Sequence, residues 1–284
     1  MGTTKPLTRA GVDRQLDERR LDRHPVGTDP VSRSWNALTV STVPTASYLV
    51  CGTPRGGTSL LCGLLAGTGL AGRPEEYFWR DDQSYWSQRW GVAGFADYLR
   101  AAIAQGTTPN GVFGAKVMFG YLPDLLGKLA ALPGNQGLPD RILLERAFPN
   151  LRFVWSWRED VIAQAVSWCK AIQTGVWYQG DTRRLAATPP RFDFQQVHGL
   201  VQQVIADRDG WRRWFAAQRI EPFAVGYEEL VADMVGTTRR VLGFLGIVPP
   251  EDVRIVARTA SQADALNQQW AARYRELLAA RQRR

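Results

Sequence analysis

A glycine-rich turn in the first third of the sequence has the residue types of an anion-binding loop. Gly52-Thr53-Pro54-Arg55-Gly56-Gly57-Thr58-Ser59 follows the apolar run SYLVCG and precedes LLCGLLAGTGL, in which apolar residues recur at helical spacing. Glycines let successive backbone N–H groups converge on one anion, and the N-terminus of the following helix adds the positive end of its dipole. The hydroxyls of Thr58 and Ser59 can donate to the same anion. Alternatively, the turn merely connects a strand to a helix.

The turn departs from the P-loop pattern G-x-x-x-x-G-K-[ST] at one position. Thr58 stands where that pattern has the lysine that reaches the β- and γ-phosphates of a nucleoside triphosphate. We therefore expect the loop to bind a single phosphate, with Arg55 supplying the positive charge from a different direction. An aspartate that would hold magnesium at the end of a hydrophobic strand is also missing, because the apolar run LRFVWSW ends at Arg158.

Arg158 offers a second anion site. It follows the carboxyl end of a predicted strand, where open α/β sheets bind ligands. Ser167 lies on the helix predicted to begin beside Arg158 and can donate to the same group, although a serine there can equally be a neutral surface residue. Two separate anion sites without a magnesium aspartate indicate a nucleotide phosphorylated on both its 3′ and 5′ sides.

The composition limits the remaining classes. The chain has 284 residues, 45% of them hydrophobic, with a net charge of +8, which excludes a disordered or fibrous protein. We find no basic run with interleaved aromatic residues that would mark a nucleic-acid surface, no apolar stretch long enough to span a membrane, and no secretory signal. The three cysteines have no metal-like spacing, so we expect no metal site and a reducing, cytoplasmic setting.

The order of the predicted elements indicates the fold class. Apolar strands are predicted at 47–52, 112–117, 151–157 and 222–225, each followed by a helical pattern, and long helices at 194–217 and 263–280. Strands that alternate with helices predict a P-loop-like three-layer α/β/α fold with a central parallel sheet. We place this domain at 45–284 and expect the polar segment 1–44 to be a flexible extension, or an arm that packs on a second subunit.

Four segments of the sequence resemble the PAPS-dependent sulfotransferases, and in particular the bacterial Stf0 type, a family that includes trehalose-sulfating enzymes. In chain order they are SYLVCGTPRGGTSLLCGLLAGTGLAGRPEEYF, TPNGVFGAKVM, FVWSWREDVIAQAVSWCKAIQTGVW and GWRRWF…YEELVADMVGTTRRVLGFLG, the last continued by QQWAARYRE. Together they span nearly everything from Thr45 to Glu276. The loop alone is moderately specific, whereas the four segments in order are strongly specific.

The resemblance implies that the chain transfers a sulfuryl group from 3′-phosphoadenylyl sulfate (PAPS) to a hydroxyl of a sugar such as trehalose. It implies that no metal takes part. It also implies a homodimer. By matching motif positions, the 5′-phosphosulfate is held by Arg55, Gly56, Gly57, Thr58 and Ser59, and the 3′-phosphate by Arg158 and Ser167. A C-terminal nucleotide-contacting loop falls in rough position near Trp270, Arg273 and Tyr274.

Sulfuryl transfer needs a base for the proton of the acceptor hydroxyl, and the resemblance places it at Glu76. The match to the family pattern G-x-P-x-E-[FY]-F is Gly72-Arg73-Pro74-Glu75-Glu76-Tyr77-Phe78, in which Glu75 takes the variable position. Alternation along an extended segment sends adjacent side chains to opposite sides, so we expect only one carboxylate to face the site. Lys116 is a candidate for contacting the nucleotide or the sulfuryl oxygens. Alternatively, its ammonium group extends from the end of the strand to water. Arg55 is the better candidate for stabilising charge on the leaving phosphate.

The acceptor side is less determined. Aromatic residues gather after Glu76 and form either a wall that binds a sugar ring or a packed core; they are Tyr77, Phe78, Trp79, Tyr85, Trp86 and Trp90. The acceptor can also be a non-sugar natural product with a hydroxyl. Two further classes remain open from the residues: a P-loop small-molecule kinase or NTP-binding enzyme, and a non-catalytic nucleotide- or glycan-binding protein.

Overall fold

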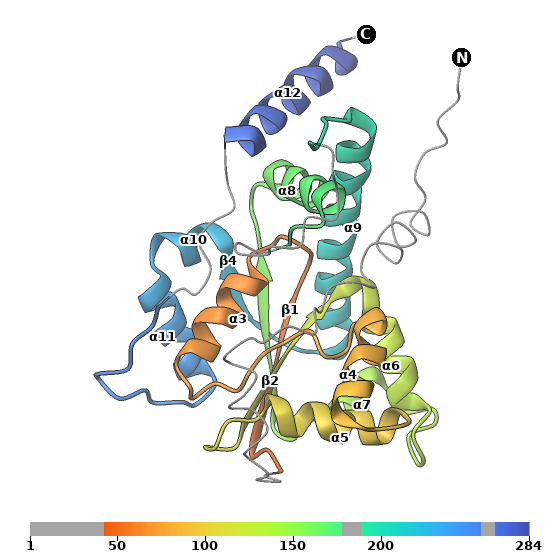
Figure 1. The fold of residues 1–284 in the computed structure, drawn as a ribbon, viewed down its shortest axis with the longest axis vertical. Coiled ribbons are helices and arrows are strands. Elements are labelled where there is room, and N and C mark those ends of the chain that lie inside the picture. The colour runs from red at the N-terminus through yellow and green to blue at the C-terminus, as the bar shows by residue number, and fades with distance from the viewer. Residues whose placement is uncertain (1–42, 178–188, 257–264, 284) are drawn as a thin grey trace.

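The computed structural model describes residues 43–177, 189–256 and 265–283 of the chain. Their centre is a sheet of four parallel strands in the order β2-β1-β3-β4. The strands are β1 Ala46–Gly52, β2 Val112–Met118, β3 Leu151–Trp157 and β4 Phe223–Gly226 (Figure 1). Each corresponds to a strand predicted from the sequence, so the parallel α/β sheet is confirmed. The predicted extension 1–44 lies almost wholly outside the described residues, and whether it is flexible stays a prediction.

Helices connect the strands and cover the sheet. In chain order the α-helices are α3 Thr58–Gly67, α4 Gln83–Trp90, α5 Phe95–Gly106, α6 Leu122–Ala130, α7 Asp140–Ala147, α8 Val161–Thr174, α9 Phe194–Gln218, α10 Tyr227–Ala232, α11 Met234–Phe244 and α12 Ala265–Gln282. Two short 3-10 helices, η2 Arg80–Asp82 and η3 Phe119–Tyr121, precede α4 and α6. Helix α9 and helix α12 match the long helices predicted from the apolar spacing.

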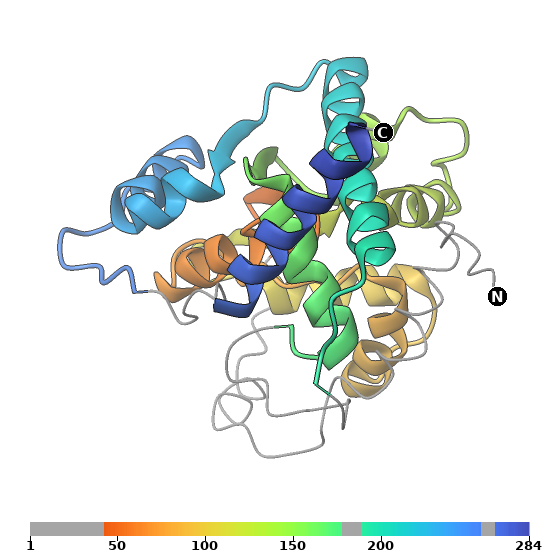
Figure 2. The same ribbon diagram turned by 90° about the horizontal axis from the view of Figure 1, so that it is seen from above.

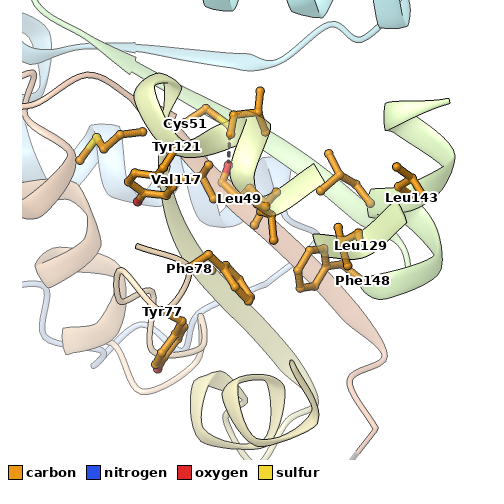
Figure 3. Close-up of a cluster of buried hydrophobic side chains, with 14 of the residues drawn as sticks. Leu49, Cys51, Tyr77, Phe78, Val117, Tyr121, Leu129, Leu143 and Phe148 are labelled. Atoms are coloured by element: carbon orange, nitrogen blue, oxygen red, sulfur yellow. Dashed lines mark hydrogen bonds between the residues drawn. The ribbon is translucent and has the colours of Figure 1, made fainter. Parts of the chain in front are cut away.

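The two faces of the central strand β1 build two separate cores, which produces the three layers. Leu49 and Cys51 face a first core lined by α5, α6, α7 and α9, in which Phe78, Phe148 and Trp211 are fully buried (Figure 3). Tyr48 and Val50 face a second core shared with α3 and α11. Because successive side chains of a strand point to opposite faces, a strand that is apolar throughout must be covered on both sides.

A third core lies among α8, α9 and α12, beyond the end of the sheet at which β3 leads into α8 (Figures 1 and 2). The C-terminal helix α12 lies across α8, and Arg275 of α12 holds the Asp160 carboxylate with its Nη2 at 2.9 and 3.0 Å. Asp160 is also the N-cap of α8, accepting the backbone N–H of Ala163. The C-terminal helix is thus joined to the start of α8, directly after Arg158.

One segment between α3 and α5 pairs with the outer edge of the sheet. The backbone carbonyl of Glu75 accepts the N–H of Lys116 at 2.9 Å, and Glu75 forms a parallel bridge with Ala115 of β2. Gly72, at φ +66, begins this segment so close to β2 that a Cβ there would lie 2.6 Å from the backbone nitrogen of Gly114. The backbone pairing therefore fixes Glu75 and Glu76 beside Lys116.

Candidate active site

The glycine-rich turn forms the expected loop between β1 and α3. Gly57 is the N-cap of α3 with φ 95, a left-handed conformation that favours glycine, and no side chain caps the helix there. The first backbone N–H groups of α3, beginning at Thr58, therefore have no partner within the helix. Thr58 is buried, whereas Ser59 is exposed. These features are those of an anion-binding helix N-terminus.

Side chains from other elements brace the loop before any ligand arrives. The amide of Gln164, on α8, donates to Thr53 Oγ1 at 2.7 Å and to the carbonyl of Pro54 at 2.8 Å. Gln164 is 1% exposed, so this contact is a buried link between α8 and the loop. Sequence reasoning missed it, since a glutamine within an apolar helical pattern gives no signal of its partner.

Two more donors hold the backbone carbonyls at either end of the turn. The indole N–H of Trp211, on α9, donates to the carbonyl of Gly52 at 2.7 Å, and the hydroxyl of Ser156, on β3, donates to the carbonyl of Gly56 at 3.1 Å. Both donors are buried. The loop is thus fixed from β3, α8 and α9, and its N–H groups keep their orientation without a ligand.

The Arg55 side chain points from the loop toward α8. Its Nε donates to Ser167 Oγ at 3.0 Å, and Nη1 donates to the carbonyl of Trp177. Burial and the nearby positive charge of Arg158 together lower the pKa of Arg55 to about 10, although Tyr227 opposes them. The structure therefore brings together Arg55, Ser167 and Arg158, the three residues predicted to surround the two phosphates. The guanidinium of Arg55 thus spans from the loop to Ser167, one of the residues predicted to bind the 3′-phosphate.

A second cluster forms where β2, α3 and the segment after α3 meet. The Lys116 Nζ lies 3.1 Å from Glu76 Oε2 and donates to Ser59 Oγ at 3.3 Å. The side chains of Lys116 and Glu76 are 11% and 20% exposed. Burial lowers the pKa of Lys116, but the combined influence of Glu76, Cys62 and Glu75 outweighs it, and the pKa is raised. Lys116 is thus an ammonium group that touches both the predicted base and the predicted phosphate loop, instead of snorkelling to water.

Tyr121, which sequence reasoning missed, belongs to the same cluster. Its hydroxyl lies 3.2 Å from Glu76 Oε1 and 3.1 Å from the backbone carbonyl of Lys116, and it can donate to either. The ring of Trp79 meets that of Tyr121 edge to face at 5.1 Å. The only sequence signal for Tyr121 is its position in the turn that follows β2.

The two adjacent glutamates differ in their contacts. Within the described residues, Glu76 and not Glu75 forms the ion pair with Lys116, in keeping with the expectation that one carboxylate faces the site. Glu75 still acts on Lys116 at longer range. Glu75 is exposed, whereas Glu76 is half-buried.

Several residues considered for the acceptor or nucleotide side fill cores instead. Tyr77 and Phe78 are 1% and 0% exposed inside the first core (Figure 3), and Trp86 and Trp90 pack against it. Trp270 and Tyr274 are buried in the third core, and whether the C-terminal segment contacts a nucleotide stays a prediction. An amphipathic helix needs such large apolar residues on the face that it buries.

Comparisons with known proteins assign most of the chain to one family. Residues 47–277 match the family described as Stf0 sulphotransferase. The chain is 29% identical to a trehalose 2-sulfotransferase of Mycolicibacterium smegmatis, covering 82% of this chain and 95% of that protein. It is also 29% identical to a trehalose 2-sulfotransferase of Mycobacterium tuberculosis, covering 80% and 94%.

A solved structure, that of a sulfotransferase from Alicyclobacillus acidocaldarius, is similar at a TM-score of 0.45 and 14% identity, over 82% of this chain and 92% of that one. No helix in the described part of the chain is long and apolar enough to cross a membrane. Because the family match extends over most of the chain and includes both clusters of the site, this protein belongs to the Stf0 sulphotransferase family and is a sulfotransferase.

Proposed function

We propose that the enzyme transfers the sulfuryl group of PAPS to a hydroxyl of a carbohydrate or glycoside, with Glu76 as the general base. The observation that carries the proposal is that one ammonium group, Lys116 Nζ, contacts both the Glu76 carboxylate and the Ser59 hydroxyl of the loop. The base and the loop that would hold the 5′-phosphosulfate are therefore adjacent. The family assignment removes the kinase alternative that the loop pattern left open.

In the proposed reaction the acceptor oxygen attacks sulfur in line with the leaving phosphate. The O–S bond to the acceptor forms as the bond from sulfur to the 5′-phosphate oxygen breaks, and the hydroxyl proton passes to Glu76. Adenosine 3′,5′-bisphosphate leaves. A positioned base and preorganised charge at the developing oxyanion are the two means by which a protein accelerates such a step without a metal.

Each residue then has a part in the proposal. Glu76 keeps 20% of its side chain exposed, so a hydroxyl entering from solvent can reach it. Lys116 pairs with that carboxylate and would contact the sulfuryl oxygens, while the N–H groups at Gly57, Thr58 and Ser59 bind the phosphosulfate. Arg55 and Gly56 complete the binding of the leaving phosphate, and Arg158 and Ser167 bind the 3′-phosphate.

A sugar acceptor is supported by the names of the two relatives, which are trehalose 2-sulfotransferases. The Trp79 ring beside Tyr121 gives an aromatic surface next to Glu76, of the kind on which sugar rings stack. The proposal also includes assembly as a homodimer, which the resemblance implies. It includes a cytoplasmic location, a reducing setting in which the three buried free thiols persist.

The test is transfer of ³⁵S from labelled PAPS to a panel of trehalose, other glycosides and phenols. We expect a labelled product with a sugar and its loss in Glu76→Gln, while that variant still binds adenosine 3′,5′-bisphosphate. Glu145→Gln, a substitution on the surface of α7, serves as the matched control and keeps full activity. A labelled product from phenols alone would contradict the proposal that the acceptor is a sugar. Full activity of Glu76→Gln would contradict the proposal that Glu76 is the base.

A further inference from the structure

Arg158 is held on two sides by residues that follow β4. Its guanidinium carbon lies 4.5 Å from the centre of the Tyr227 ring, and its Nε lies 3.8 Å from Glu228 Oε1. The Arg158 side chain is 15% exposed, and Nε has no hydrogen-bond partner in the described structure. The ring covers one face of the guanidinium, and the carboxylate faces the Nε edge.

The Glu228 carboxylate is itself fixed at the start of α8. Its oxygens accept the backbone N–H of Glu159 at 3.1 Å and that of Asp160 at 3.5 Å. Glu228 is the second residue of α10, immediately after β4, which pairs with β3 alongside Arg158. The carboxylate is therefore placed by the sheet and by contacts with backbone N–H groups as well as by Arg158.

The remaining edge of the guanidinium has no such contact. Among the residues that the structure describes, the terminal nitrogens of Arg158 make no hydrogen bond, so they are available to an anion. Arg55 carries a second positive charge close by, and the repulsion between the two guanidinium groups would drive Arg158 away if no carboxylate balanced it. A carboxylate that competed with a ligand would occupy the terminal nitrogens, whereas Glu228 occupies the opposite edge.

We infer that Glu228, together with the ring of Tyr227, is a positioning residue that fixes Arg158 so that its terminal nitrogens face the 3′-phosphate of the nucleotide. The inference rests on the proposed function. Glu228 touches no part of the nucleotide, and its effect is confined to the selectivity for the 3′-phosphate.

The experiment compares the affinities of the purified full chain for adenosine 3′,5′-bisphosphate and adenosine 5′-monophosphate, by titration calorimetry. We expect Glu228→Gln to weaken bisphosphate binding about tenfold, the loss typical of one misplaced charged hydrogen bond. Affinity for the monophosphate stays unchanged. Glu229→Gln is the matched control, because the neighbouring Glu229 pairs with Arg240 instead. It should change neither affinity.

A second background separates positioning from a general loss of structure. In Arg158→Met, adding Glu228→Gln should cause no further loss, because the group that Glu228 orients is absent. Glu228→Asp keeps the charge on a shorter side chain, so its affinity for the bisphosphate should lie between those of wild type and Glu228→Gln. Equal or tighter bisphosphate binding by Glu228→Gln, or an equal loss for both nucleotides, would overturn the inference.

The outcome for wild type distinguishes the two proposals. If wild type does not prefer the bisphosphate over the monophosphate, the proposed function is wrong and the inference falls with it. If wild type prefers the bisphosphate and Glu228→Gln retains that preference in full, the inference alone is wrong.

Discussion

Lys116 Nζ lies 3.1 Å from the Glu76 carboxylate, although the chain forms α4 and α5 between the two residues. The contact exists because the carbonyl of Glu75 accepts the backbone N–H of Lys116, which fixes the two segments in register. The ion pair is therefore part of the fold as well as of the proposed chemistry, and its two functions can be measured separately.

Removing the ammonium group should destabilise the protein. Lys116→Met leaves two neighbouring carboxylates without their counter-charge, and we expect a loss of about 3 kcal/mol in the free energy of unfolding, the lower end for a broken buried pair. Urea unfolding measures it. Lys128→Met, which breaks the more exposed pair with Asp124, is the control and should cost less than about 1 kcal/mol.

The same pair predicts a dependence on pH. The pKa of Lys116 is raised in the folded state, so its contribution to stability is complete below the ordinary lysine value of 10.5 and is lost as pH rises through the raised value. The difference in unfolding free energy between wild type and Lys116→Met should therefore stay constant from neutral pH up to about 10.5, and shrink as the pH rises from there through the raised value. A difference that grows in alkaline solution would contradict the assignment.

Tyr121→Phe should alter the pH dependence of catalysis. A hydrogen bond to a carboxylate favours its ionised form, so without the Tyr121 hydroxyl the acidic limb of kcat/KM against pH should move to higher pH. Tyr274→Phe is the control, because it removes a buried tyrosine hydroxyl that contacts His198 in the third core. An acidic limb that moves equally in both variants would show that lost stability, and not the base, is responsible.

Gly57→Ala should impair nucleotide binding through the backbone of the loop. At φ +95 a side chain is strained, and its Cβ would lie 2.9 Å from Cδ2 of the Tyr227 ring. We expect at least a tenfold loss of bisphosphate affinity, since the variant must shift the loop or the ring. Gly63→Ala, inside α3 with open space around it, should instead stabilise the protein by about 0.5–1 kcal/mol and leave binding intact.

Asp160→Ala should cost more stability than the exposure of Asp160 suggests. The residue caps α8 and holds Arg275 of α12, and loss of a cap costs about 1 kcal/mol. Asp209→Ala removes a comparably exposed carboxylate that pairs only with Arg212 among the described residues, and the change should stay within about 0.5 kcal/mol. Differential scanning calorimetry on both variants, at one pH and salt concentration, measures the two losses of stability for comparison.

The strands were predictable because each is a short apolar run bounded by turn residues, and the bounds of β3 match the prediction. The loop and Arg158 were predictable because parallel strands bring their carboxyl ends to one edge. Helices α4 and α7 were not predicted, since both are short and largely polar.

The contacts between side chains of distant segments could not be predicted. Gln164, Trp211 and Glu228 reach the site from helices whose sequence pattern reports only which face is buried. Tyr121 is similar: a tyrosine in a turn has no signature until its neighbours are known. Residue types and spacing therefore indicate which groups could do the chemistry, whereas the groups that hold them in place depend on tertiary packing.

The segment that carries Glu76 joins β2 through main-chain atoms, which every amino acid possesses. Substitutions at the variable position 75 can therefore exchange that side chain without displacing Glu76. The place of the Glu76 carboxylate beside Lys116 is set by the backbone, so the sequence of this segment can vary while the ion pair persists.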